Sequence, residues 1–357
     1  MRYLLLVGCL LPFSLAFAQP QSPSLQPAAT RSVVQTLIGA LDNYVFSAKA
    51  KSIQAYLRAH EAVYMRIDNA EALASRLTDD LRSIGNDKHF RVRYSDVADA
   101  ESSTETDQAE MLREHEAEEA NAMGIRSVTR LPGNVGYLKL SYFSNDPESS
   151  NIVAAAMWLL QGSDALIIDL RHNQGGTTSM LDDLLAYFFV DQQKLRSVST
   201  RSLGKISVEN GYTSLYTPAP RFIDKPLFVL TDSRTFSAGE ECAYDLQALK
   251  RATLVGETTA GGANPGSDHD LGNRFEVFIP TGLVSNPITK ANWEGVGVTP
   301  DVPVSAAMAL EMAYTLALKA STSHVADPDL DKARAAAIAD PKAALKKVGF
   351  EVQPQGN

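Results

Sequence analysis

The chain has 357 residues, of which 45% are apolar and 21% are charged. This composition excludes a disordered protein, and the length allows two or three domains with a sizeable core. The formal net charge is −9, so no surplus of Lys and Arg is available to neutralise phosphates, which argues against nucleic acid as the main partner.

The first 18 residues have the pattern of a secretory signal peptide. Arg2 supplies the positive flank, the apolar run "LLLVGCLLPFSLAFA" follows, and "AFA" before Gln19 is typical of a cleavage site. The run is shorter than the roughly 20 residues that a membrane span needs. We therefore expect a mature protein that begins at Gln19, is exported to the periplasm or secreted, and has no membrane span.

A lipoprotein anchor is the alternative for this segment, because "LVGC" ends at Cys9. It is less favoured, because almost no apolar sequence precedes that cysteine. Cleavage after residue 18 would remove Cys9 and leave Cys242 as the single cysteine, so we expect no internal disulfide.

The rest of the chain divides by composition and periodicity. Residues 19–30 are rich in Pro, Ser and Gln and are interpreted as a flexible lead-in. Between residues 31 and 84 apolar residues recur at a spacing of three and four, which predicts a small domain of amphipathic helices. Residues 85–325 form the predicted core, in which 95–132 are an acidic, solvated excursion with a short helix. Residues 326–357 are a predicted tail with a peripheral helix and a frayed end.

The core alternates between strand and helix patterns. The runs "VGYLKL", "ALIIDL", "PLFVLT" and "TLVGE" predict strands, and amphipathic or apolar segments such as "SMLDDLLAYFF" separate them. Continuous apolar strands joined by helices indicate crossover units on a largely parallel sheet, so the expected fold class is α/β.

Ser237 lies in "TDSRTFSAGEE", between a buried strand and a helix. Together with Glu240 it forms the pattern Ser-x-x-Glu, and a helix-capping role alone would explain both residues. Its position favours more than a cap, because ligands gather at the carboxyl ends of strands in open α/β sheets. Free N–H groups at a helix N-terminus also stabilise a developing oxyanion.

A glycine turn follows the buried strand "ALIIDL" in the same way. In "DLRHNQGG", Gly175 and Gly176 leave backbone N–H groups uncovered before a helix. The turn is consistent with oxyanion donors, with an anion or phosphate site, or with a tight strand-to-helix connection that needs glycine.

A nucleophilic serine needs a base, and several histidines are candidates. His172 neighbours the glycine turn, His269 lies in a polar turn, and His89 opens a strand after "GNDK". Glu294, in "ANWEGVGVTPDV", is a candidate orienting acid. From the residues alone, each of these side chains is also consistent with an ordinary structural role.

Four longer motifs carry a resemblance to a known family. They are "LPGNVGYLKL", "ALIIDLRHNQGG", "TDSRTFSAGEECAYDLQALKRATLVGETTAGGANPG" and "NPITKANWEGVGVTPDV". In this order they resemble the S41 family of serine peptidases, in the branch that includes the interphotoreceptor retinoid-binding protein repeats and the tricorn core protease. The resemblance covers roughly residues 30–320. It implies a crotonase-like or ClpP-like β/α core with an N-terminal helical domain.

The resemblance implies roles for particular residues. Ser237 matches the nucleophile of the "S-A-x-E" motif, and His89 and Glu294 match the histidine and glutamate of the tricorn-like branch. C-terminal processing peptidases of the family instead use a lysine from the Gly-rich segment after the nucleophile helix, and here that segment, "TTAGGANPG", has none. Lys88 stands where tricorn-like members have a serine, so the implied arrangement is Ser–His–Glu.

The resemblance also implies oxyanion N–H donors at Gly175, Gly176 and Ala238. No metal or other cofactor is expected, and the sequence shows no ligand set with metal spacing. The excursion at 95–132 is too short for the PDZ domain of most processing peptidases.

Three functions are compatible with these observations. The favoured one is an exported serine endopeptidase with polypeptide substrates. The alternative is a non-catalytic binding module for hydrophobic, retinoid-like or lipid-like ligands on the same fold. A crotonase-like acyl-CoA enzyme is disfavoured, because export leads to a compartment without CoA. The sequence does not indicate an oligomeric state.

Overall fold

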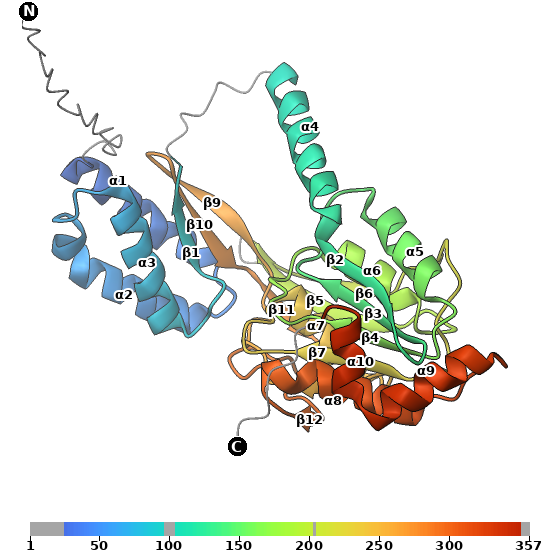
Figure 1. The fold of residues 1–357 in the computed structure, drawn as a ribbon. Helices are drawn as coiled ribbons and strands as arrows, with labels where there is room; N and C mark the ends of the chain where they lie inside the picture. The colour runs from blue at the N-terminus through green and yellow to red at the C-terminus, as the bar shows by residue number, and fades with distance from the viewer. Residues whose placement is uncertain (1–24, 96–103, 203–204, 351–357) are drawn as a thin grey trace, which may run out of the picture.

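The computed structural model describes residues 25–95, 104–202 and 205–350 (Figure 1). Its N-terminal part is helical, as the periodicity predicts, and consists of α1 (Pro27–Ala40), η1 (Leu41–Asn43), α2 (Ser47–Tyr64) and α3 (Ala70–Gly85). Asn69 caps α3 by accepting a hydrogen bond from the N–H of Ala72 at 2.7 Å. Asn86 ends α3 in the left-handed conformation, with φ 44°. That reversal directs the chain into the segment that carries His89.

The helices pack on a small antiparallel sheet of order β1-β10-β9. Its strands are β1 (Arg91–Tyr94), β9 (Gly266–Gly272) and β10 (Phe275–Pro280). Leu57 of α2 and Leu77 of α3 share a buried cluster with Phe275 and Val277 of β10. The helical part is therefore sealed by strands that follow the Ser237 helix in sequence.

The central sheet has six strands in the order β12-β8-β7-β4-β3-β2. The strands are β2 (Ile125–Leu131), β3 (Val135–Leu140), β4 (Ala165–Asp169), β7 (Leu227–Thr231), β8 (Thr253–Gly256) and β12 (Val302–Pro303). All neighbours pair in parallel except β2 and β3. The predicted α/β class with a largely parallel sheet is confirmed.

Helices cover both faces of this sheet. The alternation along β4 divides its side chains, so that Leu166 and Ile168 join one apolar cluster and Ile167 joins another. The first cluster includes residues of α5 (Ser149–Leu160), α6 (Thr178–Ala186) and α7 (Ala238–Ala248). The second includes residues of α8 (Ala306–Ala320), α9 (Pro328–Ala339) and α10 (Pro341–Lys347). The C-terminal segment thus contributes buried residues such as Leu345 to the core.

The helix expected in the acidic excursion is present as the projecting α4 (Thr104–Ala120), followed by η2 (Ala122–Gly124) (Figure 1). Two features were not predicted. The excursion ends in β2, an edge strand of the main sheet. A third sheet, of order β11-β5-β6, is formed by β5 (Lys194–Ser202), β6 (Lys205–Tyr212) and β11 (Gly282–Ser285).

In the part of the chain that the structure describes, no helix has the length and apolar character required to cross a membrane. Cys242 is buried and free. Cys9 and the expected signal segment lie outside the described residues.

Candidate active site

Ser237 lies on a sharp turn between β7 and α7. Its φ is 52° and its ψ −121°, a conformation that glycine adopts easily and other residues at a cost of about 1–3 kcal/mol. The N–H of Ser237 donates to Oε2 of Glu240 at 3.0 Å, so the capping interaction expected from Ser-x-x-Glu is present. Cap residues normally have an extended backbone, so a capping role alone does not account for the strained φ and ψ of Ser237.

Glu240 connects this turn to the Gly-rich segment. Its carboxylate accepts hydrogen bonds from the N–H groups of Gly261 at 2.6 Å and Gly262 at 2.8 Å, and from the hydroxyl of Thr259. Burial raises the pKa of Glu240, and these hydrogen bonds oppose that rise. The glutamate therefore fixes the Ser237 turn against the segment that contacts His89.

The glycine turn after β4 lies directly against Ser237. A Cβ on Gly175 would stand 2.6 Å from the Cβ of Ser237, and a Cβ on Gly176 would stand 1.9 Å from the carbonyl oxygen of Phe143. Both positions have positive φ, so only glycine fits them without strain.

The three predicted oxyanion donors differ in their partners. The N–H of Gly175 donates to Oδ1 of Asn173 at 2.9 Å. Within the described residues, no hydrogen bond engages the N–H of Gly176 or that of Ala238, the first residue of α7. Gly176 and Ala238 are therefore the two of the three whose N–H groups are available for a ligand.

His89 precedes β1 and is packed beside the Ser237 turn. Its side chain is 7% exposed, and its ring lies 4.7 Å from that of Phe236, the residue before Ser237. A Cβ on Gly262 would meet both Phe236 and Cε1 of His89. In this protein the imidazole thus lies against the segment in which processing peptidases of the family carry a lysine. Among the described residues no hydrogen bond joins His89 to Ser237.

Glu294 and an unpredicted residue, Asp87, lie close to His89. The ligand atoms of the three side chains all lie within 4.8 Å of one another. Oδ1 of Asp87 accepts from the N–H of His89 at 3.0 Å and is 3.4 Å from its Nδ1. Oε2 of Glu294 accepts from the N–H groups of Ala263 at 2.7 Å and Asn264 at 3.2 Å.

The carboxyl group of Glu294 has a raised pKa. Burial is the largest cause, and the charge of Asp87 adds to it, whereas the N–H of Ala263 and the imidazole of His89 act in the opposite direction. No ligand set with metal spacing is evident in the sequence, but the fold assembles a His–carboxylate set that is compatible with a metal ion. The local signal was "DKH", with Asp87 two residues before the candidate base.

Lys88 does not take part in this cluster through a hydrogen bond that the structure describes. Its Nζ donates to the carbonyl oxygen of Ala260 at 2.6 Å, which links the segment before β1 to the Gly-rich segment.

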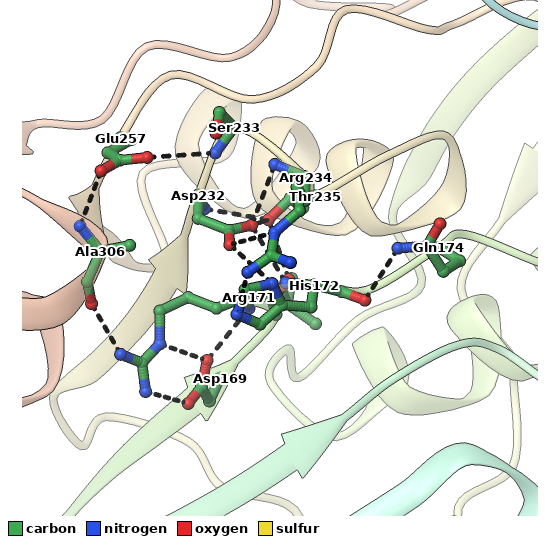
Figure 2. Close-up of polar contacts among 11 residues, drawn as sticks. Asp169, Arg171, His172, Gln174, Asp232, Ser233, Arg234, Thr235, Glu257 and Ala306 are labelled. Carbon is green, nitrogen blue, oxygen red and sulfur yellow. Dashed lines mark hydrogen bonds and ion pairs between the residues drawn. The ribbon is translucent and has the colours of Figure 1, made fainter. Parts of the chain in front are cut away.

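His172 forms a separate network at the carboxyl ends of β4 and β7 (Figure 2). Its Nδ1 lies 3.0 Å from Oδ2 of Asp232, and its Nε2 lies 2.8 Å from a guanidinium nitrogen of Arg234. Arg171 beside it pairs with Asp169, at 2.6 Å. Because the Arg234 guanidinium has no lone pair to offer, Nε2 of His172 must accept from it and is not free to accept a serine proton.

His269 lies on β9, where its Nε2 is 3.3 Å from Oγ of Ser267. Of the three candidate histidines, His89 alone is packed against the residue adjoining Ser237.

A pocket of about 430 Å³ opens beside Ser237, Gly176 and Ala238. Val198, Val284 and Trp293 give it apolar walls, and Arg196 and Glu241 contribute polar atoms. The Arg196 guanidinium is neutralised by two contacts to Asp182, at 2.8 and 2.6 Å, and one to Glu241, at 3.0 Å. The pocket therefore offers apolar surface and a paired charge next to the candidate nucleophile.

Comparison with known families places this site in context. Residues 134–304 match the model of peptidase family S41, and residues 25–128 match the N-terminal domain of Peptidase_S41 described in eukaryotic interphotoreceptor retinoid-binding protein (IRBP). The chain belongs to the S41 peptidase family. The resemblance seen in the four sequence motifs is confirmed, including the helical N-terminal domain of the retinoid-binding branch.

S41 relatives among characterised proteins include C-terminal processing proteases. The chain is 36% identical over 133 residues to a carboxyl-terminal-processing protease of Synechocystis, covering 36% of this chain and 29% of that protein. It is 30% identical over 183 residues to the chloroplastic carboxyl-terminal-processing peptidase 2 of Arabidopsis thaliana, covering 49% and 34%. The matched region thus spans about a third of these relatives.

Solved structures share the fold over most of the chain. A putative peptidase from Parabacteroides merdae aligns with TM-score 0.54 and 18% identity, over 79% of this chain and 90% of that one. A lipoprotein from Streptococcus agalactiae aligns with TM-score 0.53 and 16% identity, over 86% and 99%. These likenesses support the S41 fold assignment.

Proposed function

We propose that this S41 family member is a serine peptidase that hydrolyses polypeptides, with Ser237 as nucleophile, His89 as general base and Glu294 as the acid that orients the imidazole. The observation that carries the proposal is the position of His89. Its ring is buried against Phe236, next to Ser237, and Glu294 lies within reach of the same ring.

The proposed reaction follows from these positions. Oγ of Ser237 attacks the peptide carbonyl while His89 accepts its proton. Negative charge then develops on the carbonyl oxygen, where the N–H groups of Gly176 and Ala238 stabilise it, helped by the N-terminus of α7. Protonated His89 gives the proton to the leaving amine, and water hydrolyses the acyl-enzyme in the same manner.

Glu294 and Glu240 support this reaction without transferring the proton themselves. Glu294 stabilises the imidazolium and is held by two N–H groups through its other oxygen. Glu240 holds the Ser237 turn and the Gly-rich segment together. Hydrogen bonds between nucleophile and base are commonly long before substrate binds, so we expect the contact between Ser237 and His89 to form in the substrate complex.

Covalent labelling tests the nucleophile directly. A fluorophosphonate probe should label the wild-type protein at Ser237, identified by peptide mass, and should not label Ser237→Ala. Labelling of His89→Ala should be strongly reduced, because an unactivated serine reacts slowly. Equal labelling of Ser237→Ala and the wild type would refute the assignment.

A second candidate function is a binding module for hydrophobic ligands. The apolar walls of the pocket beside Ser237, formed by Val198, Val284 and Trp293, favour it. Trp293 fluorescence with added retinol or fatty acid would report such binding. Saturable binding by a protein that neither cleaves peptides nor reacts with fluorophosphonate would support this function in place of peptidase activity.

We also propose that the protein is exported and acts outside the cytoplasm. The proposal is supported by Arg2, the apolar run after it and the small residues before Gln19.

A further inference from the structure

The cluster of Asp87, His89 and Glu294 contains more acceptors than its own hydrogen bonds use. Asp87 is 1% exposed and the His89 side chain 7% exposed. Nδ1 of His89 and Oε1 of Glu294 are both buried and without a hydrogen-bond partner among the described residues. A buried polar atom without a partner costs about 1–3 kcal/mol, so two such atoms in one cluster indicate a missing ligand.

The charges in the cluster also indicate a missing ligand. Two carboxylates face one imidazole in a buried setting, and the neighbouring cation, Lys88, donates to a carbonyl oxygen instead. Buried carboxylates need a compensating positive charge or a proton. A bound cation would supply that charge and a partner for both free atoms.

Each carboxylate is already oriented by groups outside the cluster. Tyr44 donates to Oδ2 of Asp87 at 3.1 Å, and two N–H groups donate to Oε2 of Glu294. Oδ1 of Asp87 and Oε1 of Glu294 remain directed to the cluster. Orientation of ligand carboxylates by a second layer of hydrogen bonds is typical of metal sites.

One imidazole nitrogen and two carboxylate oxygens form a ligand set that suits Zn²⁺ and leaves a fourth position open. Zinc bonds of about 2.0–2.2 Å require the donor atoms to draw somewhat closer than the 4.8 Å limit within which they lie. Mg²⁺ is a poor fit, because it prefers six oxygen ligands and avoids imidazole.

We propose that Asp87, His89 and Glu294 bind a Zn²⁺ ion reversibly through Nδ1 of the imidazole, and that the bound ion inhibits hydrolysis by making His89 a weaker acceptor of the Ser237 proton. The binding is a property of the cluster alone. The inhibition rests on the proposed function, in which His89 is the base.

Binding is measured first on Ser237→Ala, so that its outcome does not depend on turnover. After dialysis against a chelator, Zn²⁺ is titrated by calorimetry and Co²⁺ by visible absorption, which reports the ligand geometry. We expect one ion per chain, with affinity reduced at least tenfold when Asp87→Asn or Glu294→Gln is added. His172→Ala, which removes the histidine paired with Asp232, serves as the matched control and should bind as Ser237→Ala does.

Thermal unfolding of each variant shows whether it is folded, and both substitutions keep the size of the side chain, so either variant remains informative if the other fails to fold. Absence of Zn²⁺ binding to folded Ser237→Ala, or binding that is unchanged in both ligand variants, would overturn the proposal.

Inhibition is measured separately on the wild type. Micromolar Zn²⁺ should reduce peptide hydrolysis at least tenfold, EDTA should restore it, and millimolar Mg²⁺ should leave it unchanged. Zn²⁺ that binds at the cluster without slowing hydrolysis would overturn the inhibitory role. A wild type that binds Zn²⁺ but that, when freed of metal by EDTA, neither cleaves peptides nor reacts with fluorophosphonate would instead refute the proposed function and leave the zinc site standing.

Discussion

The hydroxyl of Tyr44 donates a hydrogen bond to Oδ2 of Asp87 at 3.1 Å, and both residues are almost completely buried. Tyr44 follows η1 in the helical domain, and the other oxygen of Asp87 accepts from the N–H of His89. One continuous set of hydrogen bonds therefore runs from the helical domain to the candidate base. The domain shared with the retinoid-binding branch thus helps to position a residue of the candidate active site.

Tyr44→Phe should lower kcat/KM about tenfold, because Asp87 loses the group that orients one of its oxygens. The hydrogen bond to a charged acceptor is worth about 1.5–3 kcal/mol, so a fall in thermal stability should accompany the loss. Tyr64→Phe is the matched control, since Tyr64 donates to Asp80 at 2.8 Å in the same domain and does not contact Asp87. Equal losses of activity in the two variants would show that only the stability of the domain matters.

Ser237→Gly should abolish hydrolysis and yet make the protein more stable than Ser237→Ala by about 1 kcal/mol. The positive φ of 52° is strained for alanine and relaxed for glycine. Chemical denaturation of the two variants provides the comparison. An alanine variant as stable as the glycine variant would contradict the strained turn inferred at this position.

Substitution distinguishes His89 from His172 as the candidate base. His89→Ala should reduce kcat at least a thousandfold, and Glu294→Gln should reduce it less, because the acid stabilises the imidazolium without moving the proton. His172→Ala should retain substantial activity, since Nε2 of His172 is occupied by Arg234. An inactive His172→Ala beside an active His89→Ala would transfer the role of base to the glycine turn.

The attachment of α4 should depend on pH. Nδ1 of His115 lies 2.6 Å from Oδ2 of Asp146, and this contact raises the pKa of His115 and lowers that of Asp146; Glu119 also faces the imidazole. The contribution of His115 to stability is complete below its unfolded pKa, about 6.5, and is lost as pH rises through the higher folded value. That of Asp146 is complete above about 3.9 and is lost as pH falls through the lower folded value.

Hydrogen exchange of the last turns of α4, corrected for intrinsic rates, should therefore be slowest between about pH 4 and 6.5 and faster at pH 8.5. In the variant His115→Gln, the exchange rate of the last turns of α4 should no longer rise between about pH 6.5 and 8.5. Identical pH profiles for the variant and the wild type would exclude the contact as the cause.

The proposed export predicts that residues 1–18 are cleaved from the chain. Protein recovered from its native host should begin at Gln19, which intact-mass measurement detects. A mass that retains residues 1–18, or one that shows an acylated Cys9, would contradict cleavage at this position.

Local patterns were sufficient to predict much of the fold. The continuous apolar runs of β4 and β7 and the amphipathic spacing of α1 to α3 each indicate an element without help from distant residues. β6 was missed although Ile206, Val208 and Tyr212 alternate with polar residues, and these apolar side chains are exposed instead of packed on the core. β2 was missed because Arg126 and Arg130 interrupt its pattern, and its pairing with β3 makes up for weak local preference.

The candidate site was predictable only where a motif lies within one segment. Ser237 and Glu240 fall in one short stretch at the end of a buried strand, the place where ligands gather in open α/β sheets. The proximity of Asp87 to Glu294 depends on how β1 pairs with β10, which no local pattern encodes. For the same reason, the contact of His172 with Arg234 became apparent only in three dimensions, because the two residues are 62 positions apart. The contact of Gly175 with Asn173, by contrast, is a local turn of two residues.

The pairing of β1 with β10 has a consequence for synthesis of the protein. The segment of His89 is made early but is held by residues that leave the ribosome much later, as shown by Lys88 and Ala260, which are 172 positions apart. Until β10 and Glu294 have emerged, the helical domain lacks the sheet that seals its core and the candidate base lacks its acid. Contacts of such long sequence separation form slowly. A nascent chain therefore lacks the proposed arrangement of Ser237, His89 and Glu294 until Glu294 has been synthesised.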